Sequence, residues 1–228
     1  MQILALETST DSGSCALWRD GELLSADCPP GRAHSETLIP LVQRLLAEAG
    51  SGFAGLDGIA FGMGPGAFTG LRVACGIAQG MAVGLDLPVL PVGSLESMAW
   101  AAGEGKVLAL LDARMGEVYG GCFRRAGMTL EPLGELLLAA PAALPLPAAA
   151  SGWRAVGNAL TAYPELQARC AGWECHPDIL PHARSVAELA ALALARGEGL
   201  DAALAAPRYI RDKVAQTVAE RLAAGGRS

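Results

Sequence analysis

The sequence has few basic residues and no long apolar run. Its 17 lysines and arginines are outnumbered by 23 acidic residues, which gives a formal net charge of −6 and a pI near 5.1. A protein that binds nucleic acid on its own normally presents a basic face, so this balance argues against that class. No stretch holds about 18 uninterrupted apolar residues, and no charged segment precedes the first apolar residues. We therefore expect neither a membrane span nor a signal peptide, and a cytoplasmic protein.

Several motifs of catalytic and metal sites are also missing. The glycine loop Gly64–Gly70 has no lysine, which a P-loop requires. There is no G-x-S-x-G motif, although a hydrolytic triad assembled in space stays open as an alternative. His34 is the only histidine in the first 175 residues, and with Glu36 it does not make a transition-metal site. The spacing within Cys170–His176 matches no common zinc module, so free thiols and no metal are expected.

The composition that is present is that of a chain able to form a packed core. With 52% hydrophobic residues, 228 residues can bury a sizeable core, as one large domain or two small lobes. The apolar strand Val107–Asp112 ends in an acid and repeats the pattern of Ile3–Glu7. This internal echo agrees with a duplicated architecture. We expect a first lobe over residues 1–104 and a second over 105–228, with the last helix able to pack back on the first lobe.

Local patterns predict the main elements. Asp20-Gly21 between two apolar runs predicts a hairpin with a type I′ turn. Apolar residues at helical spacing predict helices over 36–49, 69–85, 186–195 and 213–224, and Ser94 is expected to cap another over 94–103. Strands are expected at 58–62, 89–92 and 155–157. The Ala/Pro-rich segment 139–150 is interpreted as a loop.

Around the glycine loop the sequence changes from strand to helix. Ile59–Phe61 closes an apolar strand, glycines and a proline follow, and an apolar run begins near Thr69. This order points backbone N–H groups at an anion or a partner surface. Gly62-x-Gly64-x-x-Ala67 has the letters of a dinucleotide loop, but the acidic Asp86 precedes the next strand instead of ending it. A tight turn with no ligand stays open as the alternative.

The helix after this loop carries a row of small residues. Gly76, Gly80 and Gly84 recur every four residues, with a row of alanines beside them. Each interior glycine costs about 1 kcal/mol relative to alanine. Three glycines on one face of the helix therefore predict that the backbone of another helix approaches closely there. Arg72 and Gln79 interrupt the apolar run, which favours a helix contact in a soluble protein over pairing in a membrane.

Five segments that span nearly the whole chain resemble one family. They are Gly64-Pro-Gly-Ala-Phe-Thr-Gly-Leu-Arg72 with its small-residue helix, Glu7-Thr-Ser-Thr10, His34-Ser-Glu36, Asp112-Ala-Arg114-x-x-Glu117-Val-Tyr119 and Pro207-Arg-Tyr209-x-Arg211. Together they resemble the bacterial TsaB family of tRNA threonylcarbamoyladenosine biosynthesis proteins. The resemblance implies a duplicated two-lobe, actin/hexokinase/Hsp70-like (ribonuclease H-like) α/β fold.

The resemblance also directs attention to two acidic loops. In nucleotide-using members of this superfamily, one acidic loop from each lobe grips the phosphates and their metal. Glu7 and Asp112 occupy the matching strand ends, and Thr8, Ser9 and Thr10 follow Glu7. Neither loop has the glycine of an Asp-x-Gly turn, so the backbone should approach phosphate less closely. We expect these five residues to form a vestigial nucleotide site, with ATP or ADP bound only in a multi-subunit complex. Capping of the strand end is the equal alternative for the hydroxyls.

The function implied is that of a subunit without catalytic residues. It would bind a TsaD-type catalytic subunit, which transfers threonylcarbamoyl to the adenosine next to the anticodon, and a TsaE-type ATPase would join them. Contact with tRNA would be indirect. The helices over 36–49 and 69–85 would form the surface that binds the catalytic subunit, and the chain alone would form a homodimer through the same two helices. The residues predicted for that surface are His34, Leu38, Leu41, Leu45, Arg72, Gly76, Gly80 and Gly84. The alternative is an independent enzyme, either a degenerate kinase-like ATPase or a glycopeptidase-like hydrolase.

Overall fold

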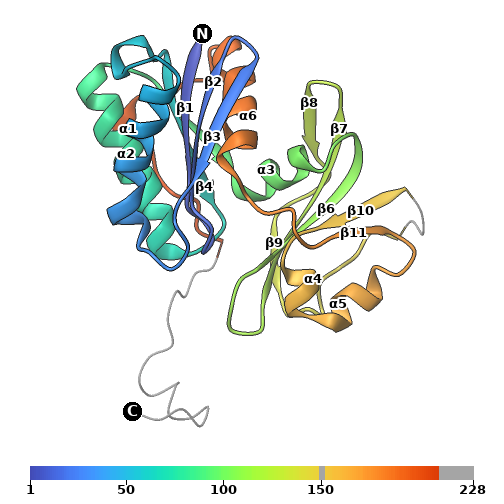
Figure 1. Cartoon of the computed structure of the whole chain (residues 1–228). Coiled ribbons are helices and arrows are strands. Elements are labelled where there is room, and N and C mark those ends of the chain that lie inside the picture. The colour runs from blue at the N-terminus through green and yellow to red at the C-terminus, as the bar shows by residue number, and fades with distance from the viewer. Residues whose placement is uncertain (149–151, 211–228) are drawn as a thin grey trace, which may run out of the picture.

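Two β-sheets, each covered by helices, lie side by side in the computed structural model, which describes residues 1–148 and 152–210 (Figure 1). The first part of the chain forms β1 (Gln2–Glu7), β2 (Ser14–Arg19), β3 (Glu22–Asp27), α1 (His34–Glu48), the 3-10 turn η1 (Phe53–Gly55), β4 (Gly58–Gly64), α2 (Phe68–Leu85), β5 (Val89–Gly93) and α3 (Ser94–Ala101). The remainder forms β6 (Gly105–Asp112), β7 (Val118–Ala126), β8 (Thr129–Pro132), β9 (Leu137–Ala139), β10 (Trp153–Val156), α4 (Ala159–Ala162), α5 (Pro164–Arg169), β11 (Glu174–His176), α6 (Ala183–Ala195) and the 3-10 turn η2 (Ala202–Leu204).

The first sheet has the strand order β3-β2-β1-β4-β5. Strands β1, β2 and β3 are antiparallel neighbours, whereas β1, β4 and β5 run parallel. The hairpin between β2 and β3 turns at Asp20 and Gly21, whose φ angles of 48° and 95° are the positive values a type I′ turn needs. The predicted hairpin is therefore confirmed.

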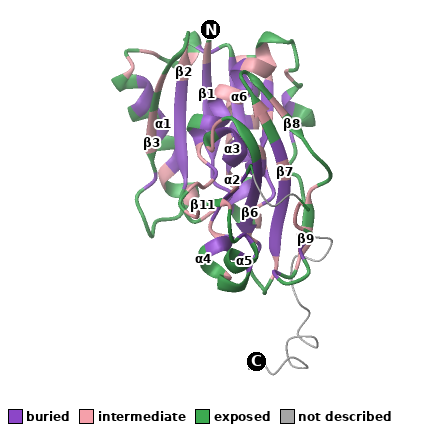
Figure 2. Ribbon diagram, turned by 90° about the vertical axis from the view of Figure 1, so that its right-hand side faces the viewer, coloured by how far each residue is buried: buried purple, intermediate pink, exposed green. Residues whose placement is uncertain are grey.

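Helices cover both faces of this sheet, so its central strands are buried on both sides (Figure 2). Along β1, Leu4 and Leu6 pack into one core cluster with α1 and α2, while Ile3 and Ala5 pack into a second cluster with α6. Successive strand residues point to opposite faces, which is why an uninterrupted apolar run predicts a strand buried on both sides. Figure 1 shows α1 and α2 on one face and α6 on the other.

The second sheet repeats the pattern of the first, with the order β11-β10-β6-β7-β8 and with β9 paired to β7. Strands β6, β7 and β8 are antiparallel, and β6, β10 and β11 are parallel. Helix α3 packs over one face, and α4 with α5 over the other. The shared strand pattern and the flanking helices are those of the duplicated two-lobe fold expected from the sequence.

The described segment after α6 returns along the first sheet, and Arg208–Ile210 lie at the cleft between the sheets. Leu200 forms an antiparallel bridge with Val89 on β5. The side chain of Gln79 on α2 then donates to the carbonyls of Ala202 and Ala205, both at 3.0 Å. Beyond them, the backbone N–H of Arg208 donates to the carbonyl of Met63 at 2.7 Å. We call residues 199–210 the C-terminal strap.

Helix α2 is long and apolar enough to cross a membrane by length and composition alone, with a mean hydropathy of 1.3. That is weak evidence, because core helices of soluble proteins pass the same test. Here Leu71, Ala74 and Ala78 are buried on the side of the helix that faces the sheet. Its packing is that of a helix lying on a sheet.

One predicted element needs correction, and others lie outside the described residues. Ser94 does not cap α3, because the helix begins at that residue, Gly93 occupies the cap position, and the Glu96 carboxylate accepts from the Gly93 N–H at 3.2 Å. The tail helix expected over 213–224 lies outside the described residues. So do Arg211 and the last two residues of the segment 139–150.

Candidate functional site

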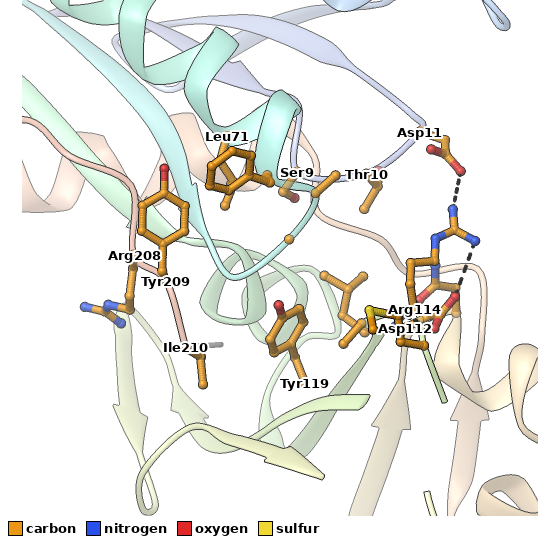
Figure 3. Close-up of a pocket in the computed structure, with 17 residues that line it drawn as sticks. Ser9, Thr10, Asp11, Leu71, Asp112, Arg114, Tyr119, Arg208, Tyr209 and Ile210 are labelled. Carbon is orange, nitrogen blue, oxygen red and sulfur yellow. Dashed lines mark hydrogen bonds and ion pairs between the residues drawn. The ribbon is translucent and has the colours of Figure 1, made fainter. Parts of the chain in front are cut away.

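A cleft of about 260 Å³ lies between the two sheets (Figure 3). The β1–β2 loop supplies Ser9, Thr10 and Asp11, and the start of α2 supplies Phe68 and Leu71. The second sheet and the C-terminal strap complete the lining with Leu111, Asp112, Ala113, Arg114, Met115, Tyr119, Asn158, Arg208, Tyr209 and Ile210, beside Gly66 and Ala67 of the glycine loop. Of the five residues predicted for a vestigial nucleotide site, Ser9, Thr10 and Asp112 line this cleft. Glu7 and Thr8 do not.

Glycines at the end of β4, in the following loop and in the first turn of α2 allow this segment to pack directly against the end of β1 and the residues after it. A β-carbon on Gly62 would lie 2.0 Å from Glu7 Oε2, and one on Gly70 would lie 1.8 Å from the Thr8 carbonyl oxygen. A β-carbon on Gly66 would lie 2.5 Å from Ser9. The two loops are also hydrogen-bonded, since Thr8 Oγ1 donates to the Gly70 carbonyl at 2.7 Å. These glycines therefore serve loop-to-loop packing, in agreement with the interpretation of a tight turn.

Glu7 lies inside the protein, not in the cleft. Its side chain is fully buried, Oε1 accepts from the Ser9 N–H at 2.6 Å, and Oε2 has no hydrogen-bond partner. Burial raises the pKa of the Glu7 carboxyl, and the hydrogen bonds from Ser9 and Thr8 and the nearby His34 offset this only in part. Of the two acidic residues predicted for a nucleotide site, only Asp112 therefore lines the cleft.

Asp112 lies at the cleft but is held by groups of its own lobe. Its Oδ1 accepts from the Tyr163 hydroxyl at 2.8 Å and from the Arg114 N–H at 2.9 Å, and its own N–H donates to Asn158 Oδ1 at 2.9 Å. Burial, followed by the hydrogen bond to Asp112, raises the pKa of Tyr163 to about 12. No sequence pattern pointed to Tyr163, which comes from the segment where patterns are weakest.

The strap forms one wall of the cleft. Arg72 Nε donates to the Tyr209 hydroxyl at 3.0 Å, and the Arg72 guanidinium stacks over the Phe68 ring at 3.7 Å. Arg208 Nη1 lies 3.6 Å from Glu96 Oε1 at the start of α3. The predicted interface residue Arg72 therefore contacts its own chain, at the junction of α2 and the strap.

Among the residues that the structure describes, no group of three or more histidine, cysteine, aspartate or glutamate side chains could hold a metal ion. All six cysteines are free thiols. Burial raises the pKa of Cys170 to about 11, and Cys175 is half-buried.

The residues predicted for a partner surface separate into two groups. Leu38, Leu41 and Leu45 are buried in the core between α1 and the first sheet, so the leucine stripe is not spare surface as the sequence suggested. The glycine row of α2 is the opposite case. Gly76, Gly80 and Gly84 are exposed, and a β-carbon on any of them would meet no atom within 4 Å beyond the helix's own backbone and adjacent residues.

His34 starts α1 and ties it to the β1–β2 loop. Its Nε2 lies 3.0 Å from the carbonyl oxygen of Thr10, whereas the cap position of the helix is Ala33, which makes no side-chain cap. The ring also fills the space beside Gly13, where a β-carbon would lie 2.6 Å from His34 Nδ1. The histidine is thus an anchor between α1 and the cleft loop.

Known proteins resemble the chain over nearly its full length. The family model described as tRNA N6-adenosine threonylcarbamoyltransferase (TsaD) matches residues 30–218. The tRNA threonylcarbamoyladenosine biosynthesis protein TsaB of Escherichia coli is 36% identical over 226 residues, covering 94% of this chain and 96% of the relative. The TsaB protein of Haemophilus influenzae is 46% identical over 123 residues, about half of each chain (52%).

A solved structure also resembles this chain in its fold. It comes from Pseudomonas aeruginosa, is described as a protein with similarity to peptidase YEAZ, and superposes with a TM-score of 0.84 at 39% identity, covering 92% of this chain and 99% of that one. The sequence relatives and this shared fold lead to one conclusion. The chain belongs to the TsaB family of tRNA threonylcarbamoyladenosine biosynthesis proteins.

Proposed function

We propose that this chain, a subunit in threonylcarbamoyladenosine biosynthesis by its family, is non-catalytic and acts by binding a TsaD-type catalytic subunit. The observation that carries the proposal is the open glycine row of α2. Each of its glycines costs the helix about 1 kcal/mol relative to alanine. Because nothing in the described chain packs against Gly76, Gly80 or Gly84, no contact within the chain accounts for that cost. A partner helix packed on the glycine row would account for that cost.

The surroundings of the row suit such a contact. Val83 beside it is 71% exposed, Leu204 of the strap is 69% exposed, and Ile39 on α1 is 42% exposed. These residues lie on elements that pack against one another, since α1 and η2 both contact α2, and contiguous exposed apolar surface marks protein interaction sites. In the proposed assembly, α1 and α2 meet two helices of the partner as a four-helix bundle. The same surface joins two copies of the chain when the partner is absent, so the two assemblies exclude each other.

The cleft supports the non-catalytic part of the proposal. Glu7 is buried away from the cleft, and Asp112 is hydrogen-bonded within its lobe. ATP is therefore expected to bind the isolated chain weakly or not at all. In this proposal a TsaE-type ATPase joins the complex. This chain contacts tRNA only indirectly, through the complex, which acts in the cytoplasm.

The experiment is to fill the glycine row. Gly80→Leu has room in the isolated chain, because nothing lies within 4 Å of its β-carbon position, so the variant should fold. It is expected to be monomeric by analytical ultracentrifugation, to fail to bind the TsaD-type subunit, and to fail to restore the tRNA modification in cells that lack this protein. Glu165→Leu, at another exposed position, on α5, is the control and should retain all three properties. A folded Gly80→Leu variant that still dimerises and binds the catalytic subunit would overturn the proposal.

The purified chain distinguishes this proposal from an independent enzyme. Alone, it should neither hydrolyse ATP nor cleave peptides, and calorimetry should detect no micromolar affinity for magnesium–ATP. An ATPase or peptidase activity that Asp112→Asn abolishes would favour the independent enzyme.

A further inference from the structure

Two loops from opposite lobes meet at the mouth of the cleft. Asp11 lies in the β1–β2 loop of the first lobe, and Arg114 lies in the β6–β7 loop of the second. Arg114 Nη2 is 2.7 Å from Asp11 Oδ2, and both side chains lie at the surface, with 70% and 87% of their area exposed. Figure 3 shows this pair beside the lining residues of the cleft. The two lobes are thus joined by an ion pair at the rim.

The arginine is fixed on the second lobe before it reaches across. Its N–H donates to Asp112 Oδ1 at 2.9 Å, and its Nη1 lies 3.5 Å from Asp112 Oδ2. Asp112 is in turn held by the hydroxyl of Tyr163 and by the side chain of Asn158. An unbroken series of polar contacts therefore runs from the second lobe through Arg114 to Asp11 on the first.

The backbone that presents Arg114 is in an unusual conformation. Arg114 and Met115 have φ angles of 60° and 56°, and Gly116 follows with 75°. Two consecutive non-glycine residues in the left-handed region are unfavourable for L-amino acids and persist only where surrounding contacts hold them. Strain of this kind gathers at ligand clamps and switch regions. Here it occurs at the residue that contacts Asp11 of the other lobe.

We propose that the Asp11–Arg114 pair is a latch that holds the two lobes closed over the cleft, with Asp112 and Tyr163 as positioning residues. Breaking the pair lets the lobes separate and enlarges a space of about 260 Å³. Since exposed ion pairs are individually weak, the latch shifts the ratio of closed to open molecules by up to about fivefold. Salt screens exposed charges, so high ionic strength opens it.

The test measures the separation of the lobes in the full chain. Fluorophores attached through noncanonical amino acids at Glu22 and Glu165, both exposed and one on each lobe, avoid the six native thiols. Single-molecule energy transfer then counts closed and open molecules. Asp11→Asn is expected to lower the closed-to-open ratio by up to about fivefold. In 1 M NaCl the wild-type chain should behave like the variant, and the variant should respond little to salt.

Two comparisons exclude a general effect of removing a carboxylate. Asp20→Asn removes an exposed charge that pairs with the amino terminus at 2.6 Å inside the first lobe, and it should leave the lobe separation unchanged. A double-mutant cycle of Asp11→Asn and Arg114→Gln should show non-additive effects, as expected for two groups that act through one contact. An unchanged distribution in Asp11→Asn, an equal effect of Asp20→Asn, or additive single effects would each overturn the latch.

Discussion

Replacing Gly70 by alanine tests the packing of the glycine loop against β1. The added β-carbon would lie 1.8 Å from the carbonyl oxygen of Thr8, a backbone atom that cannot rotate away. Since carbon and oxygen in close contact sit about 3.3–3.6 Å apart, the two loops must separate by about 1.5 Å. That movement also stretches the hydrogen bond from Thr8 Oγ1 to the Gly70 carbonyl.

The expected loss of stability follows from these contacts. Overpacking costs about 1–3 kcal/mol, and a weakened buried hydrogen bond adds about 1 kcal/mol. The higher helix propensity of alanine offsets up to about 1 kcal/mol. With that full offset, we expect Gly70→Ala to lower the free energy of unfolding by about 1–3 kcal/mol. For a chain of this size that corresponds to a fall in Tm of about 2–12 °C.

Gly76→Ala, in the same helix, is the matched control. In the monomer, no atom beyond the helix's own backbone and adjacent residues lies within 4 Å of its β-carbon position, so only the propensity gain applies and Tm should rise by about 1–4 °C. Thermal melts followed by circular dichroism measure both variants, at a protein concentration low enough that light scattering shows monomers alone. A Gly70→Ala variant that melts at or above the wild-type temperature would refute the packing argument.

Three further predictions concern ionisable side chains. Because the pKa of Glu7 is raised above about 4.5, the free energy of unfolding should fall as the pH rises from that value through the folded pKa, and Glu7→Gln should remove this fall in denaturant titrations at pH 5 to 8. Asp112→Asn should lower the pKa of Tyr163 from about 12 toward 10, and an unchanged ultraviolet titration would contradict the hydrogen bond between them. A brief pulse of thiol reagent should modify the half-buried Cys122 and Cys175 before the four buried cysteines, as read by peptide mass spectrometry.

The elements that local patterns specify were predictable from the sequence. The Asp20-Gly21 turn needs only its own two residues, and α2 was expected over 69–85 and is observed over Phe68–Leu85. Short strands such as β11 were missed, because three residues hold too little periodicity to distinguish a strand from a loop. The pattern also could not say how deep a side chain lies. Glu7 ends a strand, as an acidic residue of a nucleotide cleft would, yet its side chain lies inside the protein against Gly62.

The candidate site was predicted only in part for a related reason. Helical spacing identified the apolar stripe of α1 but not whether the stripe exceeds what the core needs, and Leu38 and Leu45 are fully buried. The glycine row is exposed on α2 and its role as a partner surface stays a prediction, because its openness depends on where α1 and the strap lie. Contacts such as Arg114 with Asp11 join residues 103 positions apart, so no local pattern reveals them.

The position of α6 has a consequence for the order in which the protein is made. Ile3, Ala5, Ala60, Leu90 and Val92 on one face of the first sheet are covered by a helix that begins at Ala183. The ribosome completes the strands of that sheet about 100 residues before it completes the helix, a delay of about 5–20 s at roughly 5–20 residues per second. During this interval an apolar sheet face is exposed on the nascent chain, so chaperones have most to protect there. The first sheet to be synthesised is the last to be covered.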